Sequence, residues 1–180
     1  MEQEPHSIPH TVLMSAGTGG TSATLRRYFR YKAYPTQLVV VDPENAVFFD
    51  YYHSRDKDLC ADVGSRIEGI GRPQVEPSFQ ADVVDRMIRV PDAASIAIML
   101  WLDRLIGRKP GASTGTNLWG VFQVAQEMMG KQQSGSIVSL MCDSGERYLD
   151  TYYDSDWVAN NIGDLQVYVD QLPPGLMATR

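Results

Sequence analysis

Short apolar runs alternate with amphipathic segments along this chain. Residues 11–16 and 37–41 are apolar runs that end at glycines and at Asp42-Pro43, the pattern of buried strands. Residues 22–31 lie between them and predict a helix that exposes its arginines. Two buried strands around one helix predict a βαβ unit, and therefore a parallel sheet with a right-handed crossover.

The second half repeats this alternation. Residues 85–90 predict a strand, and we expect the following helix to begin with Asp92 as N-cap and to end near Gly107. A further helix is predicted to end with Gly130 at C′. Its apolar stripe consists of Leu118, Val121, Phe122, Ala125, Met128 and Met129. Residues 136–141 predict a last buried strand, so the fold class is α/β, with a mostly parallel sheet flanked by helices.

Two stretches lack a clear pattern. Residues 44–81 are rich in charge and turn formers, and we expect them to be irregular; a long loop in a compact domain is usually functional or misassigned. The chain from residue 160 is weakly patterned, and Pro173-Pro174-Gly175 predicts a frayed end.

Composition narrows the classes of protein that fit. The 180 residues suit one domain, and 43% apolar with 21% charged residues is ordinary for a soluble protein. A net charge of −6 argues against a nucleic-acid partner. No apolar run approaches the roughly 18 residues of a membrane helix, and from its acidic start we expect no signal peptide. We expect a cytoplasmic protein with reduced, buried thiols at Cys60 and Cys142 and no metal site.

Gly17-Thr18-Gly19-Gly20-Thr21 joins the first strand to the first helix. Glycines let backbone N–H groups converge, and the helix N-terminus adds partial positive charge, so this loop suits a phosphate. A tight turn that binds nothing is an equal alternative. A dinucleotide site with Asp42 on the ribose is another, although Ser22 occupies the sixth position of that fingerprint, where glycine is expected.

Three further loops carry candidate chemistry. In Gly111-Ala112-Ser113-Thr114-Gly115, a hydroxyl either caps the next helix or pairs with a pyridine nitrogen. The turn from Asp143 to Tyr148 follows a strand, at the edge of the sheet where ligands gather, or is simply solvated. Gly69, in Glu68-Gly69-Ile70-Gly71-Arg72, permits a loop that moves over a ligand.

In order and spacing, these four loops together resemble the C-terminal part of the cysteine synthase and cystathionine β-synthase family, the fold type II pyridoxal-phosphate enzymes. The likeness runs from about residue 11 to about residue 153 and is closest to cysteine desulfhydrases and cysteine synthase-like proteins. It implies a tryptophan synthase β-like large domain, truncated at its N-terminus. Residues 1–10 would then be a leader remnant, 11–159 an incomplete cofactor-binding domain and 160–180 a C-terminal extension.

The resemblance also implies roles for individual residues. Gly17, Thr18, Gly19, Gly20 and Thr21 would cradle the phosphate of pyridoxal 5′-phosphate. Ser113 would share a hydrogen bond with the ring nitrogen, Gly69 would line the closing loop, and the turn that begins at Asp143 would flank the ring. An amino-acid substrate is implied for the intact relative.

One element of the family is missing. Its Schiff-base lysine lies upstream of the glycine loop, in an S-x-K-x-R-like motif. None of the four lysines, Lys32, Lys57, Lys109 and Lys131, has that context. We therefore expect a part of a cysteine-metabolising enzyme that is inactive alone. A noncatalytic subunit or pseudoenzyme and a nucleotide-binding domain remain alternatives. Exposed sheet edges would favour a homodimer or other self-association.

Overall fold

A four-stranded parallel sheet forms the centre of the molecule. The computed structural model describes residues 6–173. Its strands are β1 (Thr11–Ser15), β2 (Gln37–Pro43), β3 (Arg86–Val90) and β4 (Ile137–Ser139), in the order β3-β2-β1-β4. Every neighbouring pair is parallel, and Val12 of β1 lies opposite Leu38 of β2. The α/β fold class expected from the sequence is confirmed.

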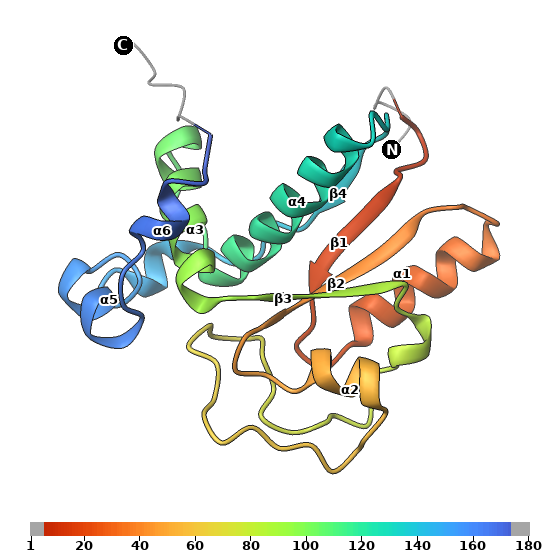
Figure 1. Ribbon diagram of the computed structural model, residues 1–180, viewed down its shortest axis with the longest axis horizontal. Helices are drawn as coiled ribbons and strands as arrows, with labels where there is room; N and C mark the ends of the chain where they lie inside the picture. Colours follow the sequence, from red (N-terminus) through yellow and green to blue (C-terminus); the bar gives the residue numbers. More distant parts are fainter. Residues whose placement is uncertain (1–5, 174–180) are drawn as a thin grey trace.

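Helices cover both faces of this sheet (Figure 1). The helices are α1 (Gly20–Tyr31), α2 (Phe48–Ser54), α3 (Asp92–Ile106), α4 (Ala112–Gly130), α5 (Ser155–Asn161) and α6 (Gln166–Val169), with 3₁₀ turns η1 (Ala81–Val83) and η2 (Gly145–Tyr148). Alternate strand residues face opposite layers, because the side-chain period of a strand is two. Val12 and Leu38 pack towards α1 and α2, whereas Leu13 and Val39 pack towards α3 and α4.

Several expected elements differ from those observed. Residues 44–81 contain α2, which was not predicted because a helix of seven residues, about two turns, is too short for a period to show. Asp92 is not an N-cap: Pro91 holds that position, and the Asp92 carboxylate accepts a hydrogen bond from the Arg66 amide at 2.8 Å. The predicted end of α3 is confirmed, since Gly107 has φ +65°.

The last helix and strand also differ from expectation. Gly130 is the final residue of α4 rather than its C′ glycine. The helix begins at Ala112, so Gly111 is the N-cap and neither Ser113 nor Thr114 has that role. The predicted apolar stripe is confirmed in part: Met128 is buried, and Leu118, Val121 and Phe122 are partly buried against the core. The fully buried face also includes Trp119, Gly120 and Val124, whereas Met129 is exposed.

The strand predicted over residues 136–141 is shorter and less buried than expected. β4 has three residues and lies at the edge of the sheet. Val138, Leu140 and Met141 are each 40–45% exposed. An apolar run indicates burial only if another element packs over it, and β4 has a strand neighbour, β1, on one side alone within the described residues.

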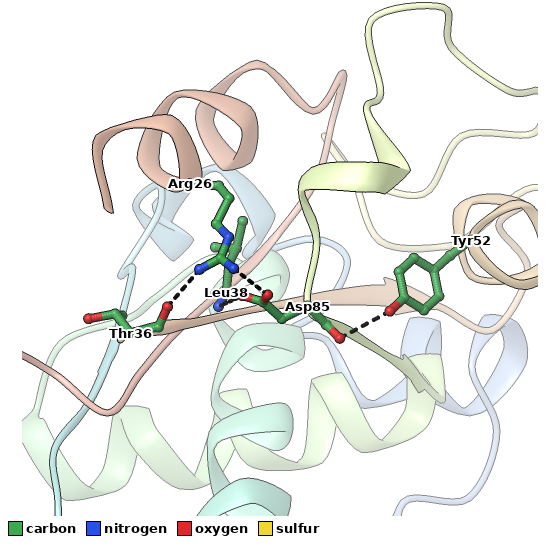
Figure 2. Close-up of polar contacts among 5 residues, drawn as sticks. All are labelled: Arg26, Thr36, Leu38, Tyr52 and Asp85. Atoms are coloured by element: carbon green, nitrogen blue, oxygen red, sulfur yellow. Dashed lines mark hydrogen bonds and ion pairs between the residues drawn. The ribbon is translucent and has the colours of Figure 1, made fainter. Parts of the chain in front are cut away.

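Asp85 joins the start of β3 to three other elements (Figure 2). Its carboxylate accepts hydrogen bonds from the Leu38 amide at 2.7 Å and from Arg26 Nη2 at 2.6 Å. Arg26 also donates to the Thr36 carbonyl, and the Tyr52 hydroxyl donates to the Asp85 carbonyl. This cluster holds α1 and α2 against the edge formed by β2 and β3.

The C-terminal stretch packs on α3. Leu172 is buried in the core between the sheet and α3, and Trp101 Nε1 donates to the Pro173 carbonyl at 3.1 Å. The rest of the predicted frayed end, Pro174 and Gly175, lies outside the described residues. No helix within residues 6–173 has the length and apolar character that crossing a bilayer requires.

Candidate functional site

Two adjoining cavities open beyond the carboxyl ends of β1 and β4. One, of about 260 Å³, is lined by residues 15–22 and Arg72. The other, of about 320 Å³, is lined by Gly69, Ser113 and Asp143 among others. Ser15 and Thr21 line both. The structure thus gathers all eight predicted site residues, which span more than 120 positions of the chain, around one hollow made of these two adjoining cavities.

The glycine loop forms the wall of the smaller cavity. Gly19 is the N-cap of α1 with φ +83°, and a Cβ there would lie 2.8 Å from the Phe79 ring. The Ser22 hydroxyl donates to the Gly19 carbonyl and fixes the turn. The first amides of α1 have no intrahelical acceptor, so they are available to a ligand at the helix N-terminus. Backbone amides, hydroxyls and one guanidinium line this cavity, without a carboxylate.

The segment that carries Gly69 is held at several points. Arg72 Nε donates to the Gly17 carbonyl at 2.9 Å. The Tyr152 hydroxyl donates to the Arg66 carbonyl and accepts from the Glu68 amide. Gly69 itself is exposed, with φ +85°. The exposed glycine therefore lies between fixed ends, beside the glycine loop.

The start of α4 and the Asp143 turn are bonded to each other. The Gly111 amide donates to the Asp143 carbonyl at 2.9 Å, and Thr114 Oγ1 accepts from the Cys142 amide at 2.9 Å. The Tyr148 hydroxyl donates to Asp143 Oδ2 at 2.6 Å. Burial and this carboxylate raise the pKa of Tyr148, so the phenol stays protonated. Thr114 fixes the turn, and Ser113 lines the cavity.

Asn117 lines the larger cavity and bonds to Ser15, which lines both cavities. It is 1% exposed, and its Oδ1 accepts from the Ser15 amide at 2.6 Å. Its Nδ2 donates to the Leu140 carbonyl at 3.0 Å and contacts Cys142 Sγ at 3.5 Å. One amide therefore fixes the end of β1 relative to the chain that follows β4. Cys142 lines the larger cavity and, like Cys60, is exposed, so the expectation of buried thiols is wrong.

Asp42 lies away from both cavities. It is fully buried, and its Oδ2 accepts from the Phe49 amide at 2.9 Å, at the start of α2. Burial raises its pKa from 3.8 to about 7, and its Oδ1 has no hydrogen-bond partner among the described residues. A ribose at the glycine loop has no access to this carboxylate.

The model of the pyridoxal-phosphate dependent enzyme family matches residues 1–143. The chain belongs to this family. Similar proteins include L-cysteine desulfhydrase Cds1 of Mycobacterium tuberculosis, 54% identical over 159 residues, which cover 88% of this chain and 43% of that protein. Cysteine synthase 2 of Emericella nidulans is 29% identical over 159 residues, covering 82% of this chain and 36% of that protein.

Cystathionine beta-synthase of Oryctolagus cuniculus is more distant, at 26% identity over 147 residues that cover 82% of this chain and 26% of that protein. These findings confirm the resemblance drawn from the loops, and the family depends on pyridoxal phosphate, as the sequence predicted. The chain spans less than half the length of each of these three relatives.

The residues present fit this cofactor. The smaller cavity is lined by the glycine loop and Arg72, which carry amide, hydroxyl and guanidinium donors suited to a phosphate, and the larger cavity shares Thr21 with it and has Ser113 in its lining. The four lysines, Lys32, Lys57, Lys109 and Lys131, are exposed, and none of them lines either cavity. Lys109 instead pairs with Asp103 at 3.1 Å.

Sequence reasoning missed two residues of this site. Arg72 was noted only as the end of the Gly69 loop, and its position directly after Gly71 was the available signal. Asn117 gave no signal, because a polar residue in a helix becomes informative only when its partners are known.

Proposed function

We propose that this chain forms the cofactor-holding part of an enzyme that removes or replaces the β-substituent of cysteine or an activated serine, with sulfide released or incorporated. The observation that carries this proposal is the hollow shared by the glycine loop, Ser113, Gly69 and Asp143. The relatives, a cysteine desulfhydrase and a cysteine synthase, support the choice of substrate.

In this proposal the loop Gly17-Thr18-Gly19-Gly20-Thr21 binds the cofactor phosphate with backbone amides and threonine hydroxyls. Ser113 orients the ring through its nitrogen, Asp143 and its turn flank the ring, and Gly69 covers the site against water. When bound, pyridoxal phosphate supplies an electron sink for charge that develops on the substrate. A hydroxyl partner leaves the ring nitrogen uncharged, which favours elimination or replacement at the β-carbon over transamination.

We further propose that the 180-residue chain binds this cofactor without turning over cysteine. The proposal rests on its exposed lysines, since a covalent tether requires an amine within reach of the cofactor.

Isothermal titration with pyridoxal phosphate, paired with a sulfide-release assay on cysteine, tests both parts. We expect saturable binding that the Ser113→Ala and Thr21→Val variants weaken, and no sulfide. The Arg30→Gln variant, which changes an exposed charge on α1, serves as the control and should bind as the parent does. Absence of saturable binding, or binding that neither site variant alters, would reject the site. Sustained sulfide release would reject the claim that the chain is inactive alone.

A further inference from the structure

Arg72 brings the one full positive charge to the wall of the smaller cavity. That cavity is otherwise lined by residues 15–22, which carry no charged side chain. Arg72 reaches it from the Gly69 loop, 55 positions further along the chain than Gly17, whose carbonyl accepts the Nε hydrogen at 2.9 Å. This bond fixes the base of the guanidinium against the glycine loop.

The positive charge of the Arg72 guanidinium is only weakly neutralised by a neighbouring carboxylate. Its ion-pair partner is Glu76, and their closest approach is 3.6 Å, between Nε and Oε1. The two terminal nitrogens therefore lie no nearer to that carboxylate. The Arg72 side chain is 41% exposed, so solvent and a ligand both have access to it. A charged fork next to unpaired helix amides is an arrangement that binds a phosphate dianion.

We propose that Arg72 is a phosphate-binding residue that adds a permanent cation to the glycine loop. The proposal rests on the proposed function, because the ligand is the phosphate group of pyridoxal phosphate. Neutral amides and hydroxyls bind the monoanionic and the dianionic phosphate with affinities that differ modestly. A guanidinium carries a full positive charge and therefore binds the dianion more tightly than the monoanion. Arg72 therefore determines how strongly affinity depends on the ionisation of the phosphate.

The same residue couples the phosphate to the Gly69 loop. Arg72 lies three residues after Gly69, and the Gly69 carbonyl lies 3.1 Å from the place where a Cβ on Gly17 would be. A phosphate bound by Arg72 and by the glycine loop holds these two segments together. Binding at one end of the hollow thereby orders the loop that borders the other end.

The test measures the affinity of the purified chain for pyridoxal phosphate, unphosphorylated pyridoxal and inorganic phosphate, by calorimetry between pH 5 and pH 8. Variants are Arg72→Gln, Arg72→Lys and the control Arg30→Gln. We expect Arg72→Gln to weaken pyridoxal phosphate binding about tenfold or more at pH 8, because one charge-assisted contact is lost. We expect pyridoxal affinity to stay unchanged and Arg72→Lys to recover part of the loss.

The dependence of affinity on pH shows whether Arg72 binds the phosphate or only supports the fold. The parent should gain affinity as the second phosphate ionisation, with a pKa near 6, is completed, and Arg72→Gln should lose most of that gain. If Arg72→Gln fails to fold, Arg72→Lys, which retains the cation, supplies the test. Its affinity for pyridoxal phosphate must still rise with pH, and an affinity that does not rise would overturn the inference. Equal affinities and profiles for the parent and Arg72→Gln, with Thr21→Val still weakened, would overturn this inference alone. No binding by the parent would overturn the proposed function with it.

Discussion

Replacing Asp42 with asparagine should change how stability depends on pH. The buried carboxyl has its pKa raised from 3.8 to about 7, chiefly by burial, while Arg89 lowers it and Asp50 raises it slightly. A raised pKa means that the protonated form is favoured in the folded state. This stabilising contribution is complete below about pH 4 and is lost as pH rises to about 7.

The size of the effect follows from the difference in pKa. The pKa of Asp42 in the folded chain lies about 3 above its ordinary value of 3.8. Since a pKa change of one corresponds to 1.36 kcal/mol, the contribution to the free energy of unfolding is about 4 kcal/mol. Asparagine retains an acceptor for the Phe49 amide and cannot ionise, so the variant avoids this loss. Its stability relative to the parent should therefore rise by about 4 kcal/mol between pH 4 and pH 8.

Urea unfolding followed by tryptophan fluorescence, at half-unit steps from pH 4 to pH 8.5, measures the difference. Subtracting one curve from the other removes groups common to both proteins, and Asp62→Asn, at an exposed carboxylate, supplies the experimental baseline. A parent-to-variant difference that stays constant across this range would refute the argument, because it would mean that Asp42 titrates alike in the folded and unfolded chains.

Three further predictions concern packing and polar contacts. Gly115→Ala should destabilise the fold by about 2 kcal/mol or more, because its Cβ would lie 2.0 Å from a carbonyl of α3; Gly130→Ala, with open space around it, should be neutral in the same urea titration. Asn117→Ala should cost about 2 kcal/mol and weaken pyridoxal phosphate binding, since it leaves the partly buried Ser15 amide and Leu140 carbonyl without this partner; unchanged melting and binding would contradict this. A double-mutant cycle on Arg26 and Asp85 should give a coupling of about 1 kcal/mol that falls with added salt, and a salt-independent value would exclude the ion pair as its source.

The sequence by itself determined the parts of this protein that depend on local pattern. The continuous apolar runs and the glycine turn specified β1, α1 and β2, because a buried parallel strand must be apolar and the chain must turn at its end. The glycine at position 107 ended α3 for the same local reason, since its φ of +65° suits a residue without a Cβ. The order and spacing of the loops identified the family before any contact was known.

Only the tertiary structure decided which side chains meet and which are covered. Asp42 looked like a ligand-binding acid, yet α2 packs over it, whereas Val138 of β4 and the following Leu140 and Met141 remain exposed. Arg72 and Gly17 meet although 55 positions separate them. Burial and proximity depend on strand order and on the elements packed above each strand, and these arise from interactions across the whole chain that no local period encodes.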